Sequence, residues 1–349
     1  MQSRIDKLIA AVGDRNAVFI SGYPNIYYYS GFSSEDAWLI ISADRRILIT
    51  DSRYFVQAAQ QAPDFDIVKY EDGWEKIFKA VPEKDIYIEE NVMTYGFYQE
   101  LKKKSGDKRF HGAQSVIDAP RRNKDKDELK IIAEAEEIAS RAFLYMLERM
   151  HPGQTEREIA LELEMYMKQQ GASRLSFETI AASGVRGAMP HGVASDKTVE
   201  KGELLTLDFG CVYKGYCSDM TRTVVFGSPD AKQREIYDIV LKAQTAALDG
   251  IYKGISCSAA DLLAREIIKD AGYEKNFGHA LGHSVGIEIH EKPVFSPKSK
   301  DTLEEGNVLS VEPGIYIEGW GGVRIEDLIA VIDGKIVDLS TASKTMIQL

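Results

Sequence analysis

Apolar and polar residues follow a mixed strand and helix pattern in the first third of the chain. Three short apolar runs have the length of buried strands: residues 17–20, 38–41 and 47–50. Two stretches have the apolar spacing of helices: residues 53–61 and 74–81. This pattern predicts an α/β domain over residues 1–120. A polar, highly charged stretch then predicts a linker at residues 121–127.

The remainder of the chain, residues 128–349, repeats one pattern twice. Each half opens with a long amphipathic helix, at 128–150 and 231–252, and continues into a second helix that ends at Gly171 or Gly272. Two N-caps are expected for these second helices: Thr155, in a capping box with Glu158, and Ser258. Each half then ends in a hairpin with two acidic residues. The repetition predicts an α+β domain with an internal pseudo-twofold duplication.

The acidic residues of each hairpin are expected to lie on one face. A turn over residues 213–215, with its centre near 213.5, predicts that Asp208 lies opposite Asp219. A turn centred on Gly319 in the same way places Glu312 opposite Glu326. Opposed carboxylates in apolar sequence repel each other unless a cation lies between them. Either pair alone could be solvated acids at the surface. The same arrangement at the end of both halves favours a metal site.

A glycine-rich segment between the hairpins contains three of the six histidines: His279, His283 and His290. A helical zinc motif is excluded, because Ala280 stands where that motif needs its catalytic glutamate. Each histidine alone would fit a hydrogen-bonded core position, whereas a cluster beside four acids favours the metal site. The charge of four carboxylates is matched by two divalent cations. Oxygen-rich ligation favours Mn²⁺, with Co²⁺, Fe²⁺ and Zn²⁺ as alternatives.

Composition limits the partners and the location. The net charge of −11 disfavours nucleic acid as a partner. No apolar run approaches the roughly 18 residues of a membrane span, so no membrane association is expected. The first residues lack the apolar core of a secretory signal. The three cysteines are too few for a disulfide framework, and a cytoplasmic protein is therefore expected.

The combined motifs resemble those of the Xaa-Pro peptidases, which comprise aminopeptidase P and prolidase in the pita-bread metallopeptidase superfamily. The segments that carry this resemblance are Leu207-Asp-Phe-Gly210, Ser218-Asp-Met-Thr-Arg222, Gly282-His-Ser-Val-Gly286, Ile289-His-Glu291, Val311-Glu-Pro-Gly314 and Val323-Arg-Ile-Glu-Asp327. It extends over essentially the whole chain, because residues 25–32 and 50–54 resemble the creatinase-like N-terminal domain of that family.

The resemblance implies a pita-bread catalytic domain and a role for each matched residue. It implies five metal ligands, the second and the last of which bridge two ions: Asp208, Asp219, His283, Glu312 and Glu326. It implies further roles around them: His191 stabilises the oxyanion, His279 and His290 line the substrate site, Arg324 orients Asp219, and Glu312 also transfers a proton. Ser310 departs from the threonine frequent in the family but keeps a hydroxyl.

The implied activity is removal of an N-terminal residue that precedes proline, and the implied assembly is a homodimer. Whether long peptides or Xaa-Pro dipeptides are cleaved stays open, although residues 50–54 favour aminopeptidase P over prolidase. A methionine aminopeptidase is not expected to carry this N-terminal domain, and creatine hydrolases lack the five ligands. A non-catalytic binding protein on the same fold is disfavoured, because no ligand is lost.

Overall fold

The structure, a computed structural model, describes residues 2–349. They form two compact units, which adjoin in sequence at Arg121 and Arg122. The predicted linker at 121–127 is shorter in the structure, because helix α6 (Gln114–Arg122) enters this stretch and helix α7 (Lys126–Leu147) begins within it. Asp125 starts α7 with a capping box to Glu128.

The first unit is built on a six-stranded mixed sheet of order β4-β3-β2-β1-β5-β6. Its strands are β1 (Ala17–Ile20), β2 (Ala37–Ile41), β3 (Arg46–Thr50), β4 (Asp66–Lys69), β5 (Asp85–Ile88) and β6 (Arg109–Gly112). Its other helices are α1 (Gln2–Val12), α2 (Tyr23–Ser30), η1 (Ser52–Tyr54), α3 (Phe55–Gln61), η2 (Tyr70–Asp72), α4 (Trp74–Lys79) and α5 (Tyr95–Lys104). The three predicted strands and two predicted helices are confirmed. Phe19, Trp74 and Phe78 pack together in the core of this unit.

The second unit contains the two predicted helix pairs. After α7 come α8 (Glu156–Gln169), α9 (Ala231–Gly250) and α10 (Cys257–Asp270). Thr155 caps α8 in the expected capping box with Glu158. The cap of α10 is Ser256, whose hydroxyl accepts from Ala259 N, and not Ser258 as predicted. Both serines fit the N-cap preference, and the helix begins earlier in the chain than the sequence indicated.

Strands occupy the space between the two helix pairs of this unit. The strands are β7 (Arg174–Leu175), β8 (Ile180–Ser183), β9 (Leu204–Phe209), β10 (Cys211–Tyr213), β11 (Tyr216–Cys217), β12 (Met220–Val225), β13 (Gly282–Ser284), β14 (Glu291–Phe295), β15 (Val308–Val311), β16 (Gly314–Ile317), β17 (Gly321–Arg324), β18 (Asp327–Ile332), β19 (Lys335–Asp338) and β20 (Ile347–Gln348). The two short 3₁₀ segments are η3 (Gly184–Ala188) and η4 (Glu274–Asn276). The main sheets have the orders β20-β12-β9-β8 and β14-β13-β15-β18-β19.

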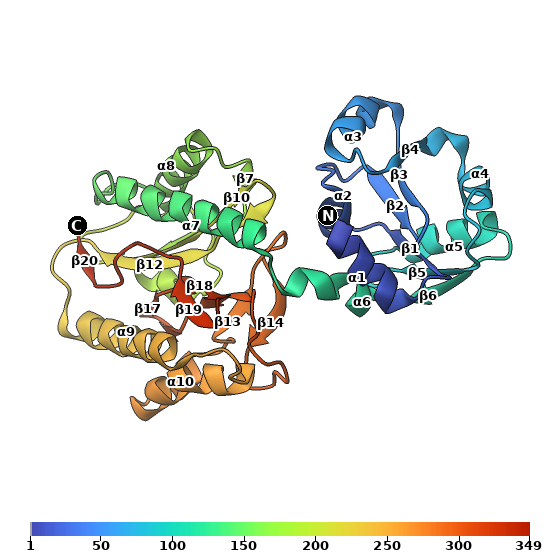
Figure 1. Cartoon of the computed structure of the whole chain (residues 1–349). Helices are drawn as coiled ribbons and strands as arrows, with labels where there is room; N and C mark the ends of the chain where they lie inside the picture. The colour runs from blue at the N-terminus through green and yellow to red at the C-terminus, as the bar shows by residue number, and fades with distance from the viewer. Residues whose placement is uncertain (1) are drawn as a thin grey trace. The chain divides into compact units, whose positions relative to one another are not determined.

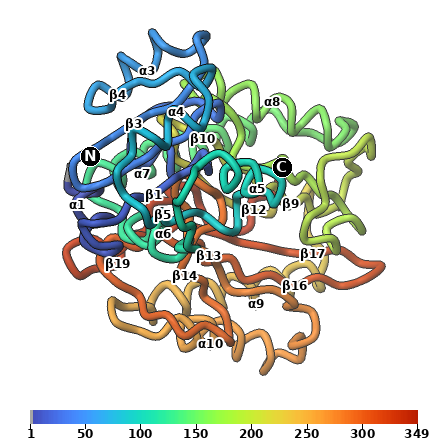
Figure 2. The backbone as a smooth tube through the Cα atoms, turned by 90° about the vertical axis from the view of Figure 1, so that its right-hand side faces the viewer, coloured from blue at the N-terminus to red at the C-terminus, as the bar shows by residue number. Residues whose placement is uncertain are grey.

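One apolar core lies on each side of these strands. The first packs α7 and α8 against β9 and β12, through residues such as Phe143, Leu163 and Phe209. The second packs α9 and α10 against β15 and β18, through residues such as Val240 and Leu309. Figures 1 and 2 both show the two helix pairs on opposite sides of the strands. The predicted duplicated α+β unit, a pita-bread arrangement, is confirmed, and it leaves the hairpin strands between the two cores.

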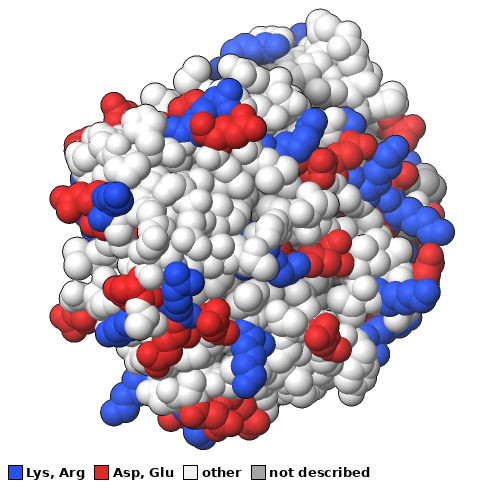
Figure 3. Space-filling view, turned by 90° about the vertical axis from the view of Figure 1, so that its left-hand side faces the viewer, with Lys and Arg blue, Asp and Glu red and all other residues white. Residues whose placement is uncertain are grey.

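On the face shown in Figure 3, acidic and basic side chains are interspersed and neither sign gathers over a large area. Within residues 2–349, the helices include none with the length and apolar character that a membrane crossing requires.

Candidate metal centre

The first hairpin joins β9 to β12 through β10 and β11, and its register differs from the prediction. Asp208 pairs with Thr221 and not with Asp219. The turn lies at Lys214 and Gly215, both with positive φ, as a two-residue type I′ hairpin turn requires. The turn centre is therefore one residue later than predicted and the pairing shifts by two. Side chains two residues apart on a strand share a face, so the shift leaves both acids on the same side.

Gly210 allows the strands of this hairpin to approach closely beside Asp219. A Cβ atom at Gly210 would lie 2.0 Å from the carbonyl oxygen of Ser218, which real side chains do not tolerate. The Ser218 hydroxyl also accepts a hydrogen bond from Cys211 N at 3.0 Å. Any larger residue at position 210 would push the Asp219 strand away from Asp208.

The second hairpin has the predicted register. Gly314 pairs with Arg324 in β16 and β17, and Val311 pairs with Asp327 in β15 and β18. Glu312 and Glu326 occupy the intervening positions and therefore lie opposite each other, as predicted.

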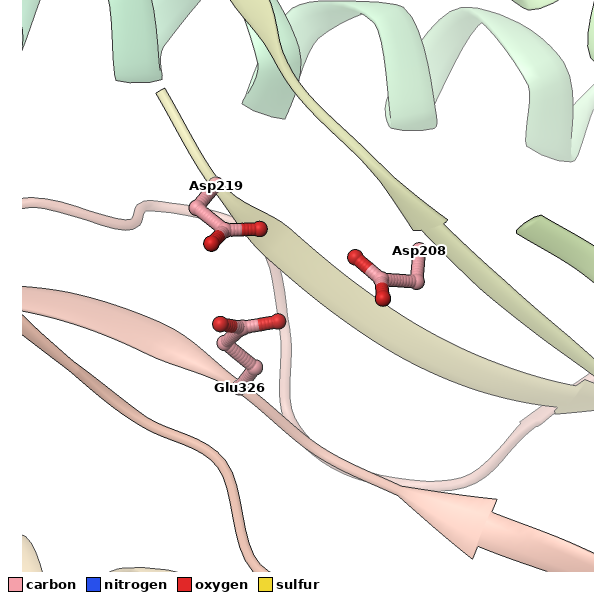
Figure 4. A group of neighbouring side chains, drawn as sticks. All are labelled: Asp208, Asp219 and Glu326. Carbon is pink, nitrogen blue, oxygen red and sulfur yellow. The ribbon is translucent and has the colours of Figure 1, made fainter. Parts of the chain in front are cut away.

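A bridge between Thr221 and Glu326 joins the two hairpins, with the amide of Glu326 donating to the Thr221 carbonyl at 3.1 Å. The acids of both hairpins thus converge, and the side chains of Asp208, Asp219 and Glu326 point toward one another (Figure 4). Their nearest carboxylate oxygens all lie within 4.8 Å of one another.

These carboxylates are buried where their charges oppose each other. Asp219 is 4% exposed and Glu326 is 1% exposed. Burial, followed by the charge of Glu326, raises the pKa of Asp219 well above its ordinary value. Burial, followed by the charge of Glu312, does the same to the pKa of Glu326. The buried Oδ1 of Asp208 has no hydrogen-bond partner among the residues that the structure describes. A cation would relieve this repulsion and satisfy that oxygen, so the residues fit a metal site.

His283 lies at the edge of this cluster, on β13. Its Nε2 is 3.5 Å from both Asp219 Oδ2 and Glu312 Oε1. Burial, together with the neighbouring His290, lowers the pKa of His283 to about 4. The ring is therefore neutral near pH 7, and a neutral imidazole is the form that binds metals. The Ser284 carbonyl, 3.3 Å from Nδ1, suits an Nδ1–H tautomer that leaves the Nε2 lone pair toward the carboxylates.

The other two histidines of this segment are placed differently. His279 has both ring nitrogens in hydrogen bonds, Nδ1 with the Ala280 carbonyl at 2.8 Å and Nε2 with the Tyr316 hydroxyl at 2.9 Å. His290 packs its ring against that of His283, with centroids 4.4 Å apart. Among these three histidines, His283 is the one with a ring nitrogen recorded within 4 Å of the carboxylates.

Arg324 organises the carboxylates, although its partner differs from the prediction. Its guanidinium donates to Asp208 Oδ2 at 2.7 Å, where the family pattern led us to expect Asp219. Its Nε donates to the Thr221 hydroxyl at 3.0 Å, and that hydroxyl donates to Glu326 Oε2 at 2.5 Å. Arg324 thus reaches one carboxylate of each hairpin. The pairing follows from the register, because Asp208 and Thr221 are direct neighbours across the strands.

Two further hydroxyl groups, those of Thr221 and Tyr316, complete the network, and the sequence predicted a role for neither. The Tyr316 hydroxyl accepts from Arg324 at 2.7 Å as well as contacting His279. A signal for Tyr316 was present in the sequence. Tyr316 lies two residues after Gly314, which pairs with Arg324, so its side chain is on the strand face next to that arginine. The Ser310 hydroxyl donates to Glu312 Oε1 at 3.0 Å. Serine in place of the threonine frequent in the family therefore still supplies this hydrogen bond.

All nine predicted site residues line one cavity of about 250 Å³. The acidic and basic lining consists of Asp208, Asp219, Glu312, Glu326, Arg324, His191, His279, His283 and His290. The remaining wall consists of Phe177, Ile180, Pro190, Ala280, Ile289 and Tyr316. The lining thus combines carboxylates and imidazoles with apolar side chains.

A duplicated pita-bread unit with a buried carboxylate and imidazole cluster between its halves is typical of metal-dependent hydrolases. Two models of known protein families match this chain. The model of metallopeptidase family M24 matches residues 130–333, and that of the creatinase/prolidase N-terminal domain matches residues 4–122. The chain belongs to metallopeptidase family M24, whose members hold divalent metals.

Similar proteins span the whole chain. An Xaa-Pro dipeptidase of Pyrococcus furiosus is 39% identical over 99% of this chain and 100% of its own length. Among solved structures, an Xaa-Pro dipeptidase from Bacillus anthracis is 40% identical, with a TM-score of 0.95 and coverage of 100% of this chain and 99% of that one. An X-Pro aminopeptidase from Thermotoga maritima is 38% identical, with a TM-score of 0.93 and coverage of 99% and 100%.

Proposed function

We propose that this chain is a dinuclear-metal exopeptidase that hydrolyses the bond between an N-terminal residue and a following proline. The observation that carries the proposal is the convergence of five ligand-type side chains on one cavity: Asp208, Asp219, His283, Glu312 and Glu326. The names of the similar proteins, Xaa-Pro dipeptidase and X-Pro aminopeptidase, support the substrate class. The oxygen-rich donor set favours Mn²⁺, with Co²⁺, Fe²⁺ or Zn²⁺ as alternatives.

The cavity suits a short peptide with a proline. Apolar side chains such as Phe177, Pro190 and Ile289 offer a surface for the pyrrolidine ring. The nitrogen of an Xaa-Pro bond carries no hydrogen, so an enzyme that recognises backbone N–H groups loses a contact there and needs such a pocket. The free N-terminal amine of the substrate would lie beside the metal-binding carboxylates.

The residues of the chain divide the chemical work. The chemistry expected of bound divalent cations at such a site is activation of a water and polarisation of the scissile carbonyl. His191 donates from Nε2 or Nδ1 to the oxygen on which negative charge develops. Glu312, whose pKa is raised to about 8 chiefly by burial, takes up a proton on its carboxylate and delivers it to the proline nitrogen. His279 and His290 position the substrate.

Substrate length separates two forms of this proposal. The names of the similar proteins favour the dipeptidase alternative over the aminopeptidase P activity that residues 50–54 suggested. The experiment compares kcat/KM for an Xaa-Pro dipeptide and an Xaa-Pro-Yaa tripeptide with Mn²⁺ present. We expect the dipeptide to be preferred, and a preference for the tripeptide would favour aminopeptidase P. An Xaa-Ala dipeptide is the matched control, and cleavage of neither proline substrate would refute the proposed function.

Assembly and location are further proposals. The family resemblance supports a homodimer, which sedimentation equilibrium would test. The three cysteines are free and buried, as is usual for a protein of a reducing compartment, and this supports a cytoplasmic location.

A further inference from the structure

His191 lies on a loop, residues 183–195, which begins at the last residue of strand β8 and includes η3. A tight turn precedes it, with Met189 N donating to the Arg186 carbonyl at 2.9 Å, and Val193 N donates to the His191 carbonyl at 2.9 Å. The position of the imidazole therefore depends on how this loop is held. A flexible loop would leave the proposed oxyanion donor off its target.

One buried carboxylate holds both ends of this loop. Glu156 is 0% exposed. Its Oε1 accepts from the amide of Ser183 at 2.7 Å and from the hydroxyl of Ser183 at 2.8 Å. Its Oε2 accepts from the amide of Ser195 at 3.1 Å, from the hydroxyl of Ser195 at 2.6 Å, and from Arg186 Nε at 2.9 Å. Arg186 in turn donates to the Val193 carbonyl at 2.7 Å.

This arrangement exceeds what a helix start or a buried acid needs. Glu156 is the first residue of α8, but the capping box there is already complete between Thr155 and Glu158. A carboxylate offers about four lone-pair sites, and Glu156 receives five donors from the loop. The burial of this carboxylate is tolerated because its two oxygens receive these five hydrogen bonds, all of them from this one segment.

We propose that Glu156 and Arg186 are positioning residues, which hold loop 183–195 so that His191 faces the carboxylate cluster. The inference rests on the proposed function, because it assigns the arrangement of His191 to that reaction. Neither residue is among those that line the cavity, so both act through the loop. No proposed metal ligand lies on the loop, and metal binding should therefore be independent of it.

The main variant is Glu156→Gln, which keeps the shape of the side chain but loses its charge and turns an NH₂ group toward N–H and O–H donors. We expect kcat for an Xaa-Pro dipeptide to fall about 10- to 100-fold, as other losses of supporting hydrogen bonds do. Metal content should stay near that of the wild type. Glu158→Gln is the matched control on the same helical turn, since Glu158 contacts Thr155 and not the loop, and its kcat should be unchanged.

A double-mutant cycle separates positioning of His191 from a general loss of structure. We expect Glu156→Gln to lower kcat less than about twofold when His191 is already Ala, because the group that the loop positions is then missing. An equal loss in both backgrounds would overturn the proposal. So would a wild-type kcat in Glu156→Gln with a lowered melting temperature, since the carboxylate would then serve stability alone.

Hydrogen exchange gives a readout that does not depend on activity. In Glu156→Gln, the amides of residues 183–195 should exchange faster while those of β9 and β12 stay protected, and Glu158→Gln should match the wild type. If Glu156→Gln fails to fold, Arg186→Met takes its place, because it leaves Glu156 with its four serine donors. Unchanged exchange in the loop of a folded variant would overturn the inference. Failure of the proposed function is distinguishable, because the wild type would then cleave neither proline substrate, whereas a wild-type kcat in His191→Ala would overturn only the role assigned to His191.

Discussion

Replacing Thr221 by valine should weaken metal binding although the side chain is not itself a ligand. Its hydroxyl is buried, accepts from Arg324 Nε at 3.0 Å and donates to Glu326 Oε2 at 2.5 Å. Valine has nearly the same shape, so Thr221→Val removes two hydrogen bonds to charged groups with little change in packing. The Arg324 Nε–H and one oxygen of Glu326 then lose their partner inside the protein.

The sign of the effect follows from the protonation of Glu326. Burial raises the pKa of this carboxyl, and the hydrogen bond from Thr221 opposes that rise by favouring the charged form. Without the hydroxyl the pKa of Glu326 rises further, and a proton competes more strongly with the cation. Loss of a group that supports a metal ligand commonly lowers metal affinity 10- to 100-fold. That range corresponds to about 1.4–2.8 kcal/mol of binding free energy.

The assay is a calorimetric titration of metal-free protein with Mn²⁺ at pH 7. Thr221→Val should bind at least one ion about 10- to 100-fold more weakly than the wild type. Thr221→Ser is the matched control, because it keeps the hydroxyl and should stay within a few-fold of the wild type. If the valine variant binds Mn²⁺ as tightly as the serine variant, the connection from Arg324 through Thr221 to Glu326 does not support the metal site.

Three further predictions test the ligands and the fold. Chelation should abolish Xaa-Pro hydrolysis, Mn²⁺ or Co²⁺ should restore it, and circular dichroism should show the metal-free protein still folded; full activity after dialysis against chelator would contradict the metal assignment. His283→Ala should lose at least one metal, while His279→Ala and His290→Ala keep both and lose about 10- to 1000-fold in kcat/KM; metal analysis that gives the reverse pattern would reassign the ligand. Asp327→Ala leaves the buried guanidinium of Arg222 without its ion-pair partner and should lower the free energy of unfolding in urea by about 3–5 kcal/mol, whereas a change below about 1 kcal/mol would mean that the pair is not needed.

The sequence predicted those parts of the site where the chemistry allows only a few residue types. Carboxylates in apolar strands and a histidine beside them have few uses, so their positions were informative in the sequence alone. The register of the second hairpin was also predictable, because its turn is centred on Gly319, a residue type that readily adopts the positive φ found there. The prediction for the first hairpin was wrong because its turn places Lys214 at a φ of 45°, and a lysine gives little sign of that conformation. The resulting error of two residues kept the correct face and changed the neighbour of Asp208 to Thr221.

Glu156 shows why the supporting residues could not be found in the same way. In sequence it is an acid in the first turn of a helix, a position where acids are common because they suit the helix dipole. Its role arises from Ser183 and Ser195, which are 27 and 39 residues away and are ordinary loop residues in sequence. A metal ligand must be one of a few residue types, but a loop can be held by any buried acceptor that the fold brings to its ends. Residues of this kind become visible only when the donors around a buried charge are counted in the folded chain, and here that count identifies the loop that carries His191.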